Sequence, residues 1–302
     1  MSTEPPPRPS FSPIGIGTES RAPFALLPDP VALFEGRATR FRATAEGALA
    51  PYLSFLAAVA EAQGRCAGGI AMLDEEAVAR SLAHGMPPID RQGLKHDAGM
   101  DVTVRRFLDA CGGVVMPEVA EAARAALLAD NARRHARIAD ALEDAVAMED
   151  VAGFVLAAAG VQVHLAGLAA GLPAAKLAPV GDGACPCCGG PPGASLVVAR
   201  DGAQGARFAV CAACGTEWNV VRVKCTLCGA TGGIAYHEIE GSTDGIQAET
   251  CDSCGLYVKI MAQERHPELD PVADDVASMA LDLKLGETVF RRGGVNPFLA
   301  GM

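Results

Sequence analysis

Four short segments organise this chain: Cys185-Pro-Cys-Cys-Gly189, Cys211-Ala-Ala-Cys-Gly215, Cys225-Thr-Leu-Cys-Gly229 and Cys251-Asp-Ser-Cys-Gly255. Each is a Cys-x-x-Cys pair followed by glycine. Adding 40 to the positions of the first two pairs gives the positions of the last two, and 22 residues separate the pairs within each half. The stretch is therefore one two-pair unit written twice.

This spacing is typical of metal sites built from four thiolates. One Cys-x-x-Cys turn directs two sulfurs at an ion, and two such turns complete a tetrahedral shell. The glycine after each pair suits a tight turn because it tolerates positive φ. A unit of about 40 residues builds little hydrophobic core, so a bound metal would replace much of it. The predicted ligands are Cys185, Cys188, Cys211, Cys214, Cys225, Cys228, Cys251 and Cys254.

The duplication favours sequential grouping, with the first four cysteines at one site and the last four at the other. Crossed grouping stays open, because only ten residues separate Cys214 from Cys225. Thiol–disulfide chemistry at the Cys-x-x-Cys pairs is a further alternative.

Cys187 breaks the symmetry of the repeat. The register aligns Cys188 with Cys228 and Cys187 with Leu227, so Cys187 is predicted to be a spare thiol beside the first site. Cys66 and Cys111 are isolated in the sequence and fit small buried hydrophobic positions.

The identity of the metal is left open by the cysteines, since both zinc and iron accept four thiolates. Only iron would add redox activity. Four protein ligands leave no open position for a substrate, so the sequence predicts no catalytic residues at either site.

Composition limits the classes of partner. The chain has 302 residues, which suggests about two domains, and its net charge of −11 does not favour a nucleic-acid-binding protein. Between Cys185 and Lys259, five basic residues face seven acidic ones, a balance unlike a phosphate-binding surface. Trp218, the one tryptophan, fits a place beside the first site as well as it fits stacking on a base.

The first part of the chain is predicted to be helical. Asp29-Pro30 is a helix start, with an N-cap followed by proline at the first helical position. Apolar residues then recur at helical spacing through several segments. The expected helices span residues 31–46, 48–63, 74–82, 101–110, 117–128, 131–148 and 151–175.

The last of these helices passes a membrane-span screen. Residues 151–175 contain no Asp, Glu, Lys or Arg. They are largely Ala and Gly, which contribute little to membrane insertion, and they include Gln162 and His164. We therefore expect a buried central helix, with His164 hydrogen-bonded in the core and no membrane insertion.

The second part is predicted to be a small β region followed by a helix. Extended segments are expected at 195–200, 207–210, 216–224, 234–239 and 256–261, and a helix at 273–285. The fold class is thus multidomain α plus small β. The expected parts are a disordered lead (1–12), a helical domain (13–180), two rubredoxin-like or zinc-ribbon-like modules (181–221 and 222–262), and a C-terminal helix and tail (263–302).

Several segments resemble the FdhE-type formate dehydrogenase accessory proteins. They are the run from Cys211 to Cys228, Ala248–Ile260, Val272–Asp282 and the tail Asn296-Pro-Phe-Leu299. The resemblance is specific from about residue 185 onward and diffuse before it. Cys187 departs from the family's first pair, where a residue other than cysteine is expected.

The resemblance implies a cytoplasmic maturation factor with a helical domain and two rubredoxin-like modules that bind iron, one ion in each site. It implies binding to the catalytic subunit of a respiratory formate dehydrogenase without enzymatic activity of its own. The absence of an apolar signal segment at the start agrees with a cytoplasmic location. A zinc-ribbon nucleic-acid-binding protein and a thiol oxidoreductase remain the alternatives, and homodimer formation stays open.

Overall fold

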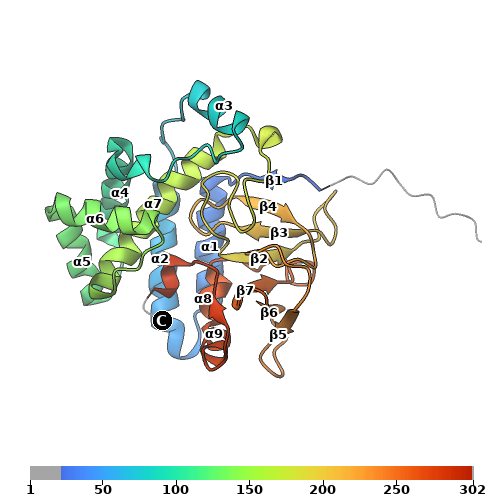
Figure 1. The fold of residues 1–302 in the computed structure, drawn as a ribbon. Coiled ribbons are helices and arrows are strands. Elements are labelled where there is room, and N and C mark those ends of the chain that lie inside the picture. The colour runs from blue at the N-terminus through green and yellow to red at the C-terminus, as the bar shows by residue number, and fades with distance from the viewer. Residues whose placement is uncertain (1–21, 301–302) are drawn as a thin grey trace, which may run out of the picture.

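Within the residues that the computed structural model describes, 22–300, one short strand and seven α-helices precede the remaining strands of a single mixed sheet (Figure 1). Every expected helix of the first part has a counterpart, so the helical prediction is confirmed. The expected disordered lead, residues 1–12, lies outside the described part. The helices are α1 (Pro30–Ala43), α2 (Ala50–Arg65), α3 (Glu75–Ala83), α4 (Ala98–Ala110), α5 (Glu118–Ala129), α6 (Asn131–Leu142) and α7 (Val151–Ala170).

Aspartate side chains begin most of these helices. Asp29 accepts hydrogen bonds from the backbone N–H groups of Val31 and Ala32, both at 3.1 Å, and Pro30 takes the first helical position as expected. Such a cap stabilises a helix by about 0.5–2 kcal/mol, because it satisfies N–H groups that have no partner within the helix. Asp74, Asp97, Asp130 and Asp150 cap α3, α4, α6 and α7 in the same way.

Helix α7 is the central helix of the helical layer, as the sequence predicts. Residues 148–170 are long and apolar enough to cross a membrane, but 83% of their apolar window is buried inside the protein. Small residues let neighbouring helices approach closely: a Cβ on Gly160 would lie 3.1 Å from the Cα of Val104 in α4. His164 is buried, and its Nδ1 lies 2.9 Å from the Thr103 hydroxyl, which confirms its expected hydrogen bond in the core.

The sheet joins both cysteine repeats into one layer. Its strand order is β1-β4-β3-β2-β7-β6-β5, with β8 paired to β7. The strands are β1 (Ala25–Leu26), β2 (Ala194–Val197), β3 (Arg207–Val210), β4 (Glu217–Val220), β5 (Ile234–His237), β6 (Ile246–Cys251), β7 (Leu256–Met261) and β8 (Arg291–Arg292).

The 40-residue repeat is visible in the strands themselves. Strand β2 corresponds to β5, β3 to β6 and β4 to β7. The repeats are joined head to tail, since the first strand of one repeat, β2, pairs in parallel with the last strand of the other, β7. The predicted fold class is confirmed, and the two modules share one sheet. The module boundary at residues 221 and 222 stays a prediction.

Several helical predictions were wrong in extent: the helix expected at 151–175, for example, ends at Ala170. The helix expected at 131–148 ends at Leu142, because Asp144 adopts a left-handed φ of 56° and its carboxylate pairs with Arg91 at 2.8 Å. The helix expected at 273–285 is divided at Ser278 into α8 (Ala273–Ala277) and α9 (Met279–Gly286). Both the carbonyl and the hydroxyl of Ser278 accept hydrogen bonds from the Lys259 ammonium.

The strand predictions differ from the structure in three lengths and three omissions, which are the two-residue strands β1 and β8 and the longer strand β6. Strand β6 was not expected, because Glu249 and Gln247 interrupt its apolar pattern. Glu249 is nevertheless buried, since its carboxylate forms two hydrogen bonds with Arg207, at 2.7 and 2.9 Å, across the repeats. The strands expected at 195–200, 216–224 and 234–239 end earlier than expected.

A buried charge cluster fixes the C-terminal helices on the sheet. Lys259 of β7 lies 3.1 Å from the Asp275 carboxylate and also contacts Asp282, and Arg292 of β8 contacts both carboxylates. Burial alone would raise the pKa of Asp275, but the charges of Arg292 and Lys259 outweigh it and lower this pKa. The carboxylate therefore stabilises the fold above its ordinary pKa, near 3.8, and this contribution is lost as the pH falls below that value.

We expect Asp275→Asn to lower the free energy of unfolding by about 3–5 kcal/mol at neutral pH, since it leaves buried positive charge without its partner. Urea unfolding of the metal-loaded protein measures this loss. The exposed Asp201→Asn is the control and should change stability by less than about 0.5 kcal/mol. Equal stability of the two variants would show that the cluster does not fix the C-terminal helices.

Candidate metal centres

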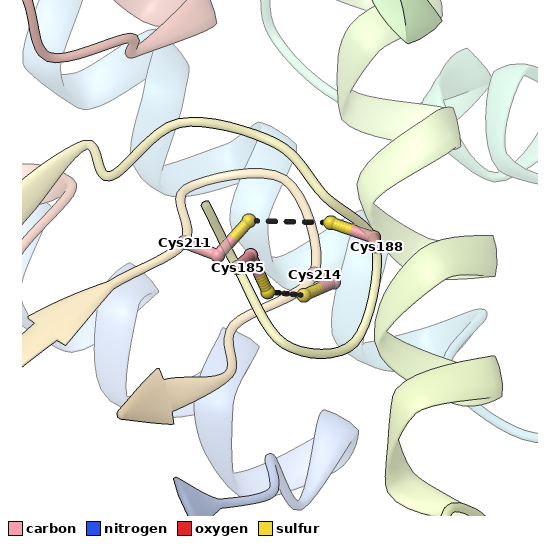
Figure 2. Close-up of side chains that lie close together, drawn as sticks. All are labelled: Cys185, Cys188, Cys211 and Cys214. Carbon is pink, nitrogen blue, oxygen red and sulfur yellow. Dashed lines mark hydrogen bonds between the residues drawn. The ribbon is translucent and has the colours of Figure 1, made fainter. Parts of the chain in front are cut away.

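Four thiols from two loops meet at the first cluster, site one (Figure 2). The sulfur atoms of Cys185 and Cys214 lie 3.6 Å apart, as do those of Cys188 and Cys211. Tetrahedral ligands with metal–sulfur bonds of about 2.3 Å have sulfurs about 3.8 Å apart. The four donors are therefore spaced for one tetrahedral ion.

The second cluster, site two, repeats this arrangement. Cys225 and Cys254 have sulfurs 3.9 Å apart, and those of Cys228 and Cys251 lie 3.7 Å apart. In both clusters all four ligand atoms lie within 4.8 Å of one another. The thiols are thus grouped sequentially along the chain, without crossing between the repeats.

The glycine after each pair closes the turn that positions the thiols. Gly189 and Gly215 have φ of 72° and 76°, and Gly229 and Gly255 have 78° and 71°. The N–H of each glycine donates to the carbonyl of the first cysteine of its pair, at 2.8 to 3.0 Å. A side chain would strain this left-handed backbone, so the glycines are part of the geometry that aims both sulfurs inward.

The burial of the thiols favours a bound cation. All four thiols of site one are buried, and burial raises the pKa of Cys185 and of Cys214 well above the ordinary value for cysteine. Ionised thiolates are costly in a dry interior unless a cation compensates them. Soft sulfur donors in a tetrahedral set fit zinc or iron, so the residues present suit the expected metal.

Cys187 is buried beside site one, and its thiol lies outside the group of four. Its backbone carbonyl accepts a hydrogen bond from the N–H of Ile89, at 2.9 Å. The segment around Ile89 therefore crosses the first pair of cysteines. Cys66 and Cys111 are buried within the helical layer, as expected.

Site one is held against the helices by two residues that the sequence did not indicate as functional. The Gln162 amide of α7 donates to the carbonyl of Ala212, between the site one ligands, at 2.7 Å. Its own oxygen accepts from Gln63 of α2 at 2.8 Å. The sequence feature that could have indicated this contact is Gln162 itself, a glutamine within an apolar helix that has no charged residues. A buried amide requires hydrogen-bond partners, so its presence there indicates a polar contact.

Arg91 is the second of these residues. Its guanidinium pairs with Asp144 at 2.8 and 2.9 Å and lies against the first cysteine loop, where a Cβ on Gly190 would be 2.5 Å from Nη1. Site one is therefore enclosed by helices and loops of the first domain.

Site two is open by comparison. Cys225 and Cys251 are buried, but Cys228 is exposed and Cys254 is partly exposed. The two sites have the same donors and different access to solvent.

Trp218 does not offer a stacking surface for a base. It lies in β4, is 5% exposed and packs in the same core cluster as Cys214. Its burial between β1 and β3 leaves no open ring face for a base.

Comparison with known proteins agrees with the architecture. Family models match three consecutive parts of the chain: FdhE, N-terminal (residues 22–182), FdhE, central domain (184–222) and FdhE, C-terminal domain (223–299). The chain belongs to the FdhE family. The resemblance noted in the cysteine repeats is therefore confirmed, and it extends through the helical domain.

Individual FdhE proteins match over nearly their whole length. An FdhE homolog of Rhizobium meliloti is 40% identical over 293 residues, which cover 95% of this chain and 96% of the relative. FdhE of Escherichia coli O1:K1 is 32% identical, with 93% of both chains covered. The crystal structure of FdhE from Pseudomonas aeruginosa has a TM-score of 0.82 at 28% identity, covering 92% of this chain and 99% of that one.

We expect Cys211→Ser to remove metal from site one alone, because the two sulfur groups share no ligand. Metal bound per chain should fall by about half, and Cys211→Ser with Cys251→Ser should remove nearly all of it. Elemental analysis of anaerobically purified protein measures both losses. Cys187→Ala is the control and should retain full metal, whereas complete loss from Cys211→Ser would indicate that the sites depend on each other.

Proposed function

We propose that this protein is an accessory factor for the assembly of respiratory formate dehydrogenase, acts in the cytoplasm and binds the enzyme's catalytic subunit. The observation that carries the proposal is the full-length match to FdhE proteins together with two complete four-thiol groups. In this proposal the protein prepares another enzyme and does not oxidise formate itself.

The eight cysteines are proposed to hold one iron in each four-cysteine group. Every tetrahedral position is supplied by the chain, so the sites offer no vacant position to a substrate. Iron bound there would supply one-electron exchange, whereas zinc would supply structure alone. The protein residues would hold the ion and limit water around site one, and they leave site two more open, with Cys228 exposed and Cys254 partly exposed.

Two features support a role in binding a partner protein. The chain is acidic and joins a large helical layer to a sheet through site one. The burial of Trp218 and the acidic balance of the repeats do not favour the nucleic-acid alternative. The thiol oxidoreductase alternative requires thiols free of metal, so metal content separates it from the proposal.

Anaerobic purification should yield coloured protein with one iron for each four-cysteine group. Oxidised iron with four thiolates absorbs visible light, and zinc does not. The visible spectrum and elemental analysis together measure the outcome. Colourless protein filled with zinc would contradict iron binding, and metal-free protein with disulfides would favour the oxidoreductase.

We expect the protein to copurify with a tagged catalytic subunit of formate dehydrogenase under reducing, anaerobic conditions. A tagged unrelated cytoplasmic protein is the control for nonspecific capture. Persistent absence of binding would contradict the proposed function even if both metal sites were filled.

A further inference from the structure

The internal repeat provides two equivalent sheet edges that differ in their neighbours. Strand β2 in the first repeat corresponds to β5 in the second. The outer edge of β2 is occupied by β7, which pairs in parallel with it from Ala194↔Lys259 to Leu196↔Met261. Among residues 22–300, β5 pairs only with β6 and ends the sheet (Figure 1).

The free edge of β5 presents backbone groups suited to strand pairing. The N–H of Asp252 donates to the carbonyl of Gly233 at 2.9 Å, which fixes the alternation of the antiparallel β5–β6 pair. Ala235 and His237 therefore bond toward β6, and the N–H and C=O groups of Ile234 and Tyr236 point to the open side. An exposed edge of this kind is a template for an added strand.

Site two lies at the start of this edge. Ile234 is directly opposite the ligand Cys251. Cys228 is exposed, while its equivalent in the first repeat, Cys188, is 3% exposed. The cover over Cys188 comes from the segment around Arg91 and from α7, and the described residues contain no counterpart over Cys228.

The chemistry around the edge indicates the kind of strand that fits. From residue 225 to 258 the sequence contains no Lys or Arg. Glu238, Glu240 and Asp252 are exposed around β5, and Tyr236 and Ile239 expose 42% and 39% of their surface. An extended segment with basic and apolar side chains would complement this surface in backbone pairing, charge and polarity.

We propose that the free edge of β5 and the open side of site two form one docking surface for an extended, basic segment of the catalytic subunit. The segment pairs with β5 as β7 pairs with β2, and it covers Cys228 as the first domain covers Cys188. This inference rests on the proposed function for the identity of the partner.

A proline at position 236 tests the backbone pairing. Tyr236→Pro removes an N–H that points away from β6, so it blocks an added strand while leaving the β5–β6 bonds in place. Tyr236→Ala is the matched control, since it loses the same side chain and keeps the N–H. We expect Tyr236→Pro to bind the catalytic subunit about tenfold or more weakly than Tyr236→Ala, with equal metal content.

A second pair of substitutions tests the charge without altering the backbone. Glu238→Lys with Glu240→Lys should weaken binding, and the remaining binding should depend less on salt concentration. In the complex formed by the unchanged chain, a chelator should remove metal from site two more slowly than in the free protein.

The outcomes separate this inference from the proposed function. If the unchanged chain does not bind the catalytic subunit, the proposed function fails. If it binds, but Tyr236→Pro equals Tyr236→Ala and the charge reversals have no effect, the docking surface is wrong and the proposed function stands. A proline variant that abolishes a homodimer while leaving subunit binding intact, measured by light scattering, would assign the edge to a second copy and also overturn the inference.

Discussion

Four thiols held within 4.8 Å of one another in a buried site can ionise together only if a cation compensates their charge, and the rest of the structure is arranged around this constraint. Each cysteine turn lies directly before a strand of the sheet, namely β2, β4, β5 and β7 in chain order. The small strands bury little apolar area of their own. The sheet is then completed by contacts that cross the repeats, above all the buried pair of Arg207 and Glu249.

Site one connects the two halves of the molecule. Through Gln162, the central helix α7 uses the backbone of a cysteine turn as a hydrogen-bond acceptor. Gln63 extends the same chain of amides to α2. Because a buried amide without a partner is costly, the helical layer and site one stabilise each other and would be lost together.

The parts of the structure that could be predicted from the sequence are those set by local spacing. The cysteine turns follow from pairs three residues apart with a glycine behind them, and the helix starts follow from aspartate caps such as Asp29. Long-range partners could not be predicted in this way. From the sequence alone, Glu249 resembles a surface residue, because nothing nearby in the chain indicates its partner Arg207. The parallel pairing of β2 with β7 joins segments about 65 residues apart, and no local sequence pattern indicates it. The burial of site one likewise depends on Arg91 and α7, which are distant in the sequence.

The head-to-tail join of the repeats has a consequence for the metals. A pair related by rotation would close on itself and give two identical environments, but a head-to-tail pair leaves different edges free on its two members. The two sites are therefore unequal although their ligand sets are the same. Solvent exposure and nearby charge tune the reduction potential of a metal with thiolate ligands. Two bound irons would therefore differ in reduction potential, and a single electron would occupy the site of higher potential. With iron bound, the duplication would thus supply one ligand set at two potentials, without any change in the cysteines themselves.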